Sequence, residues 1–290
     1  MNIRNRQRFA STKRWAPSTA LFFSLVLLSG IAGAGEAEDS EWEARRSFTV
    51  SAGVDYSKGD YGEESDTQIL SAPLTLKLEW EPVILKVTVP FLLIRGTGAV
   101  VGGSDGGVIV GDDVGPLQTD TGIGDVVASA TYVFYPESGL LPVLEFTGKA
   151  KFATADEDKG LGTGENDYTL QIDASKAFGP ITPFASFGYR FVGDPPGSPL
   201  DDPPGSDLDD ILLASGGLGI KLMDGLSIGA VYDWRQAASA RGGDSHELVP
   251  YASLKLGKRL SLNPYAVIGL SQGAADFGAG FQLSLRFGGR

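Results

Sequence analysis

The residue type best suited to acid–base or nucleophilic chemistry occurs once in this chain, as His246 between Ser245 and Glu247. These three side chains could act as a Ser-His-acid triad only if they met on one side of the backbone. The surrounding residues alternate as a β-strand does, and neighbouring side chains on a strand point to opposite faces. The chain also has no cysteine, which excludes thiolate nucleophiles and thiolate metal sites. From these residues we do not expect an enzyme.

A second candidate is the glycine-rich segment Gly160-Leu161-Gly162-Thr163-Gly164. A phosphate-binding loop needs a Lys-Ser/Thr pair and a helix after the glycines, and neither is found here. We interpret this segment as the tip of a loop.

Two acidic stretches, residues 58–66 and 194–210, carry clusters of aspartate and glutamate. Carboxylate oxygens suit Ca²⁺ or Mg²⁺, so a cation site is one interpretation. The other is a solvated loop that its charge keeps soluble. Neither stretch has the spacing of an EF-hand loop, and we predict no metal site and no cofactor.

The elements that would carry these residues are β-strands. Apolar and polar residues alternate with a period of two through most of the chain, which is the period of a strand. Twelve such runs occur, at residues 47–56, 70–80, 83–91, 125–134, 144–152, 168–175, 186–191, 212–222, 226–235, 247–256, 261–270 and 277–287.

Three features favour a membrane barrel over a water-soluble sandwich. Most runs are about ten residues long, which is enough to cross a bilayer at a tilt. Their number is even, and the connections between them are alternately short and long. An open sheet edge is not viable in hydrocarbon, so such a sheet has to close. We predict an all-β fold, a transmembrane antiparallel up-and-down β-barrel of about twelve strands with both termini in the periplasm.

The first residues are typical of a secretory signal peptide. Basic residues without acidic ones precede an apolar run and the small residues Ala32-Gly33-Ala34. We expect three parts: a cleaved signal peptide over 1–34, a short periplasmic segment over 35–46 and an outer-membrane barrel over 47–290. The expected location is the outer membrane of a Gram-negative cell. The expected partners are outer-membrane lipid and lipopolysaccharide, the barrel-assembly machinery and a small-molecule solute. The acidic net charge of −12 argues against nucleic acid.

Strand parity assigns the polar residues of each run to the inside of the barrel. The predicted pore lining is mainly basic, and rings of charge determine which solutes a pore admits. It consists of Lys86, Lys149, Lys151, Arg190, Arg235 and Arg286, together with Asp125 and Glu145. Two interpretations stay open: a narrow hydrated passage for polar or anionic solutes, and cross-lumen ion pairs that fill a small barrel.

Four stretches in the middle of the chain resemble a known family. They are Gly122-Ile-Gly-Asp125, Lys149-Ala-Lys-Phe-Ala-Thr154, Gly160-Leu-Gly-Thr-Gly-Glu-Asn-Asp-Tyr168 and Phe184-Ala-Ser-Phe-Gly-Tyr-Arg190. The chain is similar in these stretches to the bacterial outer-membrane transporter family named for the meta-pathway of phenol degradation. The resemblance implies a barrel that passes small molecules, aromatic compounds among them, and it implies no catalytic residues.

The main functional hypothesis is therefore an outer-membrane channel or transporter for small solutes, aromatic or anionic. One alternative is a non-conducting structural or adhesive barrel that displays acidic loops. Another is a lipid-modifying enzyme of the outer membrane, in which distant residues would complete a site around His246.

Overall fold

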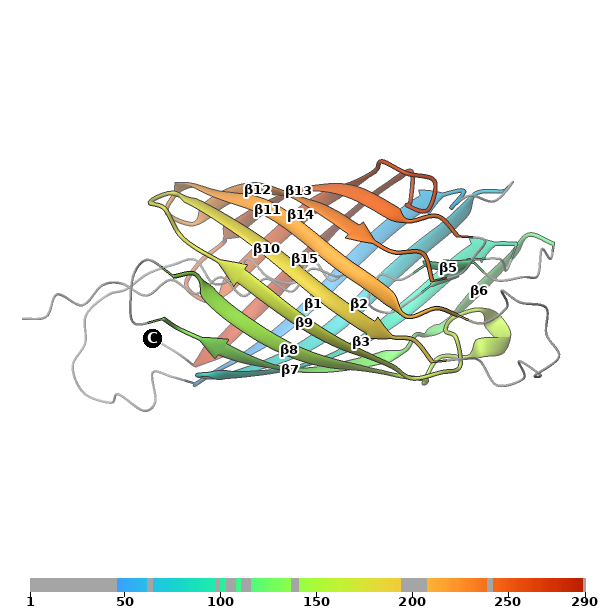
Figure 1. Cartoon of the computed structure of the whole chain (residues 1–290), viewed down its shortest axis with the longest axis horizontal. Helices are drawn as coiled ribbons and strands as arrows, with labels where there is room; N and C mark the ends of the chain where they lie inside the picture. Colours follow the sequence, from blue (N-terminus) through green and yellow to red (C-terminus); the bar gives the residue numbers. More distant parts are fainter. Residues whose placement is uncertain are drawn as a thin grey trace, which may run out of the picture.

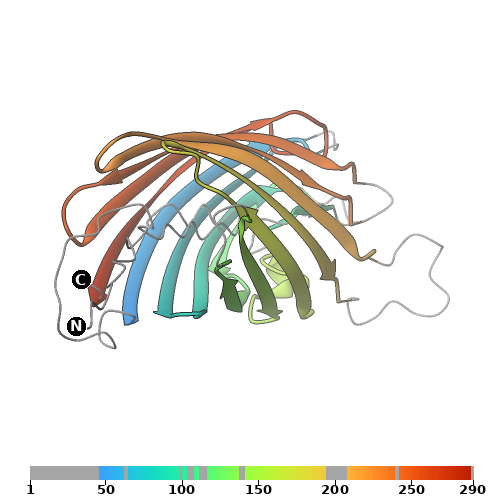
Figure 2. The ribbon, with the colours of Figure 1, turned by 60° about the vertical axis from the view of Figure 1, so that its left-hand side comes forward.

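The computed structural model describes residues 46–61, 65–97, 100–102, 108–110, 116–136, 141–193, 208–238 and 242–288. They form a closed antiparallel barrel (Figures 1 and 2). The segments around the barrel are β1 (Arg46–Gly59), β2 (Thr67–Trp80), β3 (Val83–Gly96), β6 (Gln118–Ile123), β7 (Val126–Phe134), β8 (Val143–Phe152), β9 (Asp167–Ser175), β10 (Ile181–Phe191), β11 (Ile211–Met223), β12 (Leu226–Arg235), β13 (Ser245–Lys255), β14 (Leu260–Gly269) and β15 (Phe277–Gly288).

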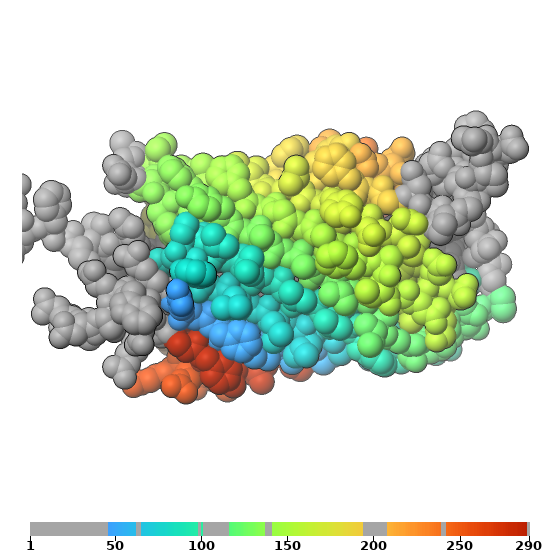
Figure 3. All heavy atoms as spheres, turned by 90° about the horizontal axis from the view of Figure 1, so that it is seen from below, coloured from blue at the N-terminus to red at the C-terminus, as the bar shows by residue number. Residues whose placement is uncertain are grey.

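The barrel closes because β1 pairs with β2 on one side and with β15 on the other. The segments β6 and β7 follow one another along β3 and together take the place of one strand. The thirteen segments of the sheet therefore make twelve strands, and the predicted fold and strand number are confirmed. In Figure 3 the outer surface passes from red β15 and blue β1 through cyan to green and yellow strands.

Connections of two kinds define the two ends of the barrel. Short turns join β2 to β3, β11 to β12 and β13 to β14 at the end where β1 begins and β15 stops, and we call this the short-turn end. Longer connections, among them residues 153–166, gather at the opposite, long-loop end (Figure 1). A small hairpin, β4 (Val100–Gly102) and β5 (Val108–Val110), lies in the connection after β3 and was not predicted.

The barrel is apolar outside and polar inside. In β2, for example, Leu78 is 51% exposed while its neighbour Lys77 is 6% exposed, and the other strands alternate in the same way. Aromatic side chains lie on the outer face near both ends, as membrane interfaces favour. Trp80, Tyr132 and Phe134 lie toward the short-turn end, and Phe152, Tyr189 and Phe191 toward the long-loop end. The outer face is therefore suited to lipid.

A β-bulge between β6 and β7 accommodates a proline in the middle of β3. Ile123 pairs with Phe91 and Val127 pairs with Thr88, so the β6–β7 side holds one residue more than β3 does. Pro90 has no N–H to donate, but its carbonyl accepts a hydrogen bond from the Gly124 N–H at 2.9 Å. A side chain on Gly124 would meet Leu92 and Pro90. The extra residue places Asp125 in the barrel interior, where it is buried.

One sequence interpretation needs correction here. The third strand continues to Gly96 rather than ending at residue 91, because Leu92, Leu93 and Ile94 are all apolar and hide the alternation. Pro90 and Pro73 lie opposite one another in the middle of β3 and β2.

The predicted signal peptide, residues 1–34, lies outside the described residues, as does the 35–46 segment except Arg46. Most of the acidic stretch 194–210 also lies outside them. Within the described ranges, no helix is long and apolar enough to cross a bilayer.

Candidate functional site: the charged lumen

The barrel interior carries most of the charged side chains that strand parity had assigned to it. The structure places all eight predicted pore-lining residues on strands or turns with their side chains on the inner face. Lys149, Lys151, Arg190, Arg235, Asp125 and Glu145 are buried, Lys86 is half-buried, and Arg286 is more open near the short-turn end. The role of these residues in solute passage stays a prediction.

Five of the cations lie on one row of paired residues. Thr49 pairs with Arg286 on one side and with Lys77 on the other. Lys77 pairs with Lys86, and Ser129 separates Lys86 from Lys149. Thr169 then connects the row to the last cation, Arg190. We call Arg286, Lys77, Lys86, Lys149 and Arg190 the basic row.

The basic row also runs along the barrel. Barrel strands tilt, so a row of paired residues climbs the barrel axis as it passes from strand to strand. It starts with Arg286 and Lys77 near the short-turn end and finishes with Arg190, the last residue but one of β10, at the long-loop end. The positive charges therefore follow a spiral path between the two mouths.

Four carboxylates form a second row. Glu145 pairs with Asp173, and the row continues through two serines to Asp233, which pairs with Glu247. On β8 this acidic row is four residues from the basic row, a separation of about 13 Å along the strand. It occupies β8 to β13, whereas the basic row occupies β15 through β1 to β10. The two rows thus overlap only on β8 to β10.

Two small charge clusters lie in the lumen, and the first, near the short-turn end, includes two cations of the basic row. Glu79 on β2 contacts Lys77 Nζ at 3.0 Å and Arg286 Nη2 at 3.3 Å. The hydroxyl of Ser47 also donates to Glu79. We call this group the Glu79 cluster; it holds one carboxylate between two cations.

The second cluster lies at the long-loop end and surrounds Lys151. Its Nζ lies 2.9 Å from Asp167 Oδ2 and 3.5 Å from Asp125 Oδ2, and it donates to Thr163 Oγ1 at 2.9 Å. Asp125 Oδ1 accepts hydrogen bonds from the backbone N–H groups of Thr154 and Ala155 at 3.1 and 3.0 Å. In this Lys151 cluster one cation is held between two carboxylates.

Three of the family-like stretches meet at the Lys151 cluster. Gly122–Asp125 supplies the bulge and its carboxylate, 149–154 supplies Lys151, and 160–168 supplies Thr163 and Asp167. The interpretation of the glycine-rich segment as a loop tip was wrong, because Leu161 has no exposed surface and Gly162 is also buried. A side chain on Gly162 would strike the Asp125 carboxylate and Ala155.

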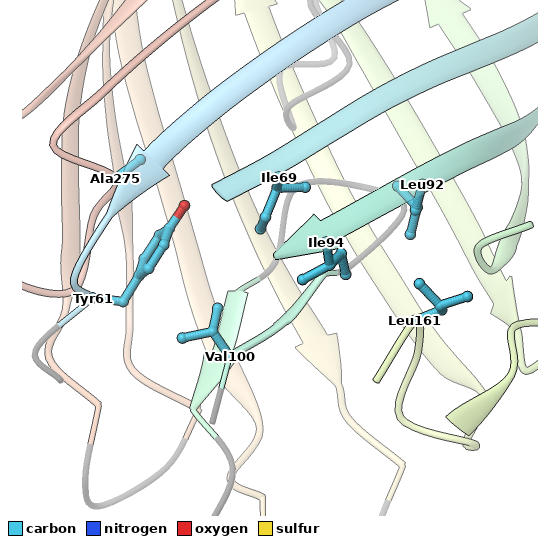
Figure 4. Packing of buried hydrophobic residues seen from close by; sticks show 7 residues of the cluster. All are labelled: Tyr61, Ile69, Leu92, Ile94, Val100, Leu161 and Ala275. Carbon is cyan, nitrogen blue, oxygen red and sulfur yellow. The ribbon is translucent and has the colours of Figure 1, made fainter. Parts of the chain in front are cut away.

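Leu161 belongs to an apolar group at the long-loop end. Ile69, Leu92 and Ile94 enter it from the inner faces of β2 and β3, and loops supply the rest (Figure 4). We call Tyr61, Ile69, Leu92, Ile94, Val100, Leu161 and Ala275 the apolar cluster. Burial there raises the pKa of the Tyr61 phenol to about 12.

Sequence reasoning missed the apolar cluster. Its members on β3, Leu92 and Ile94, lie where alternation fades, and its loop members are far apart in the chain. A leucine between glycines, Leu161, was the available indication.

His246 faces outward, away from the lumen. Its Nδ1 lies 2.6 Å from the Tyr232 hydroxyl, while Ser245 and Glu247 are buried on the inner face. The three residues therefore do not form a joint site, as the strand geometry had indicated. Among the described residues, no group of three or more histidine, aspartate or glutamate side chains is placed to hold a metal ion.

A closed antiparallel barrel with an apolar outer face and a charged interior defines a transmembrane β-barrel of the outer-membrane class. The family model described as "Putative MetA-pathway of phenol degradation" matches residues 75–287. The chain belongs to this family, as the resemblance had predicted.

Solved structures of similar fold are distant. The translocator domain of the autotransporter NalP from Neisseria meningitidis matches with 11% identity and a TM-score of 0.46, over 83% of this chain and 88% of that one. A Pseudomonas aeruginosa FadL homologue matches with 11% identity and a TM-score of 0.39, over 84% and 90%. A porin matches with 11% identity and a TM-score of 0.35, over 83% and 99%. No curated protein sequence matches.

Proposed function

We propose that this protein is an outer-membrane channel that passes small solutes and favours anions. The observation that carries the proposal is the basic row, in which five cations follow one spiral path from mouth to mouth. An anion on this path would move from one cationic side chain to the next. Several weak sites of this kind allow the anion both to enter the pore and to leave it.

The acidic row indicates which side of the lumen a solute anion would follow. Asp233 and Glu247 lie on β12 and β13, away from Lys77 and Lys86 on β2 and β3. Arg235 on β12 lies 3.9 Å from Glu247 and offsets part of this negative charge. A solute anion would therefore be held more strongly at the wall of β1 to β3 than at the wall of β12 and β13. The family description refers to phenol degradation, and for this reason aromatic acids belong among the solutes to be tested.

The proposal includes the cellular setting. Residues 1–34 would be cleaved during export, and the barrel-assembly machinery would insert the chain. The apolar outer face would contact outer-membrane lipid and lipopolysaccharide, and both termini of the barrel would face the periplasm.

The test is the ion selectivity of the refolded mature protein in planar bilayers, from the reversal potential in a KCl gradient. We expect stable conductance and a preference for Cl⁻. The double variant Lys86→Gln/Lys149→Gln should lower the anion-to-cation permeability ratio by about threefold or more, because it removes two of the three inner cations of the row.

Lys258→Gln is the matched control, because Lys258 is exposed in the turn between β13 and β14. It should leave the ratio unchanged. An unchanged ratio in the double variant would refute the basic row as the solute path. A folded, inserted protein without conductance or solute flux would favour the non-conducting structural or adhesive barrel.

A further inference from the structure

We propose that the apolar cluster is a constriction at the long-loop end of the lumen, and that residues 153–166, which we call the strap, hold it in place. This inference rests on the proposed channel function and names the part of the lumen that limits passage. It assigns the limiting role to Leu161 together with Leu92 and Ile94.

The first argument is that the apolar cluster brings loop residues against inward apolar residues of the wall. Many inward positions are serine, threonine or charged residues, yet Ile69, Leu92 and Ile94 are inward and apolar. A second apolar group also lies inside the barrel, but all its members are strand residues: Phe184, Val231, Val249, Tyr251, Tyr265 and Val267. They are buried because loop side chains, above all Leu161, cover them (Figure 4). An apolar ring in a narrow passage expels water and so resists hydrated ions.

The second argument is that polar contacts fasten the strap at its two ends. At the start, the N–H groups of Thr154 and Ala155 donate to Asp125. The first and last residues of the strap are also joined to each other, because the N–H of Ala153 donates to Asn166 Oδ1 at 2.9 Å. Lys151 reaches Thr163 within the strap and Asp167 just beyond it. Leu161 cannot move away from the inner wall with the whole strap unless these charges and donors separate.

The third argument is steric fit. The Cβ of any residue replacing Gly122 would lie 2.6 Å from Leu161 Cδ1, so the wall of β6 has no side chain where Leu161 sits. Gly164 has φ +74°, a backbone conformation that glycine adopts readily and other residues rarely do. The strap therefore places Leu161 against the inner wall, while its turn at Glu157–Lys159 stays exposed.

A constriction of this kind favours solutes with an apolar part. An organic anion can exchange water for the apolar cluster as it passes, whereas Cl⁻ loses hydration there without compensation. The basic row then receives the carboxylate. The wild type should accordingly pass butyrate better, relative to Cl⁻, than a protein without the constriction.

The experiment compares the full-length mature wild type with Leu161→Ser and Leu161→Met in planar bilayers. Leu161→Ser should raise KCl conductance by about twofold or more and lower the butyrate-to-chloride permeability ratio, because a polar side chain lets water into the apolar cluster. Leu161→Met keeps the apolar character and should behave as the wild type.

A reversible disulfide gives a second test that does not depend on the folding of Leu161→Ser. The chain has no cysteine, so Gly122→Cys/Leu161→Cys carries a single pair of thiols. The oxidised protein should show low conductance because the strap is tied to β6. Reduction should raise the conductance, because the link to β6 is broken and a shorter side chain stands in place of Leu161.

The outcomes separate the two proposals. A conducting wild type with the same conductance and permeability ratio in Leu161→Ser, and no response of the cysteine pair to reduction, would overturn the constriction and leave the channel standing. A folded wild type that passes neither ions nor butyrate would overturn the channel itself, and the constriction with it.

Discussion

The two ends of the lumen hold similar charge clusters with the signs exchanged. At the long-loop end Lys151 lies between two aspartates, and at the short-turn end Glu79 lies between Lys77 and Arg286. The difference is burial: the side chains of Lys151 and Asp125 are 5% and 1% exposed, those of Glu79 and Arg286 20% and 44%. The buried cluster fastens a loop to the wall, whereas the open cluster presents charge to whatever enters.

Removing the buried cation should have the largest effect. Lys151→Met leaves two buried carboxylates without their cation, and we expect a loss of about 3–5 kcal/mol in the free energy of unfolding. Reversible guanidinium unfolding in phospholipid vesicles measures it. Because the strap loses its fastening, KCl conductance should rise as well.

Lys159→Met is the matched control for this prediction. Lys159 forms an exposed ion pair with Asp156 at 2.9 Å, in the same strap. Its loss should change stability by less than about 1 kcal/mol. Equal effects of the two substitutions would mean that burial does not distinguish the clusters.

The next effect in size tests the packing around the buried cluster. Gly162→Val forces a side chain against the Asp125 carboxylate and Ala155, and we expect a loss of about 1–3 kcal/mol from overpacking. Gly257→Val is the control, because nothing lies within 4 Å of a side chain at Gly257. Similar unfolding midpoints for the two variants would contradict the tight seating of the strap.

The open cluster should respond weakly in stability and clearly in selectivity. Glu79→Gln removes one carboxylate but keeps a side-chain oxygen that can accept from the buried Lys77, so the unfolding free energy should fall by less than in Lys151→Met, by about 1–2 kcal/mol. Lys77 and Arg286 would then act unopposed at the short-turn mouth, and the anion-to-cation permeability ratio should rise. A large stability loss with no selectivity change would assign this cluster a structural role instead.

The comparison also shows what the sequence could and could not reveal. Period-two alternation predicted the strands, their number and the inward position of residues such as Lys149, because parity is a local property of an extended chain. The basic row depends on register between strands, and the pairing of Lys77 with Lys86 across a tight turn is the one contact that local sequence indicates. The remaining contacts follow from closure of the whole barrel.

The position of Leu161 and the strap could not be predicted from the sequence, for a different reason. In the sequence Leu161 looks like an exposed loop residue, because glycines surround it. Its partners Leu92 and Ile94 lie where the alternation of apolar and polar residues fails. Strand parity predicted that Asp125 faces inward, but its hydrogen bonds to Thr154 and Ala155 depend on how the long loop after β8 returns to the wall. Contacts of this kind depend on tertiary structure, and a single sequence does not encode them in a readable pattern.

The smallest effect is expected at His246, outside the lumen altogether. His246→Phe removes the hydrogen bond with the Tyr232 hydroxyl but keeps a ring beside it, so the unfolding free energy should fall by about 1 kcal/mol. Tyr232→Phe removes the same bond from the other side and should cost a similar amount. Conductance and selectivity should not change in either variant, because both side chains lie on the outer face. A lipid-hydrolysis assay on vesicles completes the test: fatty-acid release by the wild type that disappears in His246→Phe would replace the channel with a lipid-modifying enzyme.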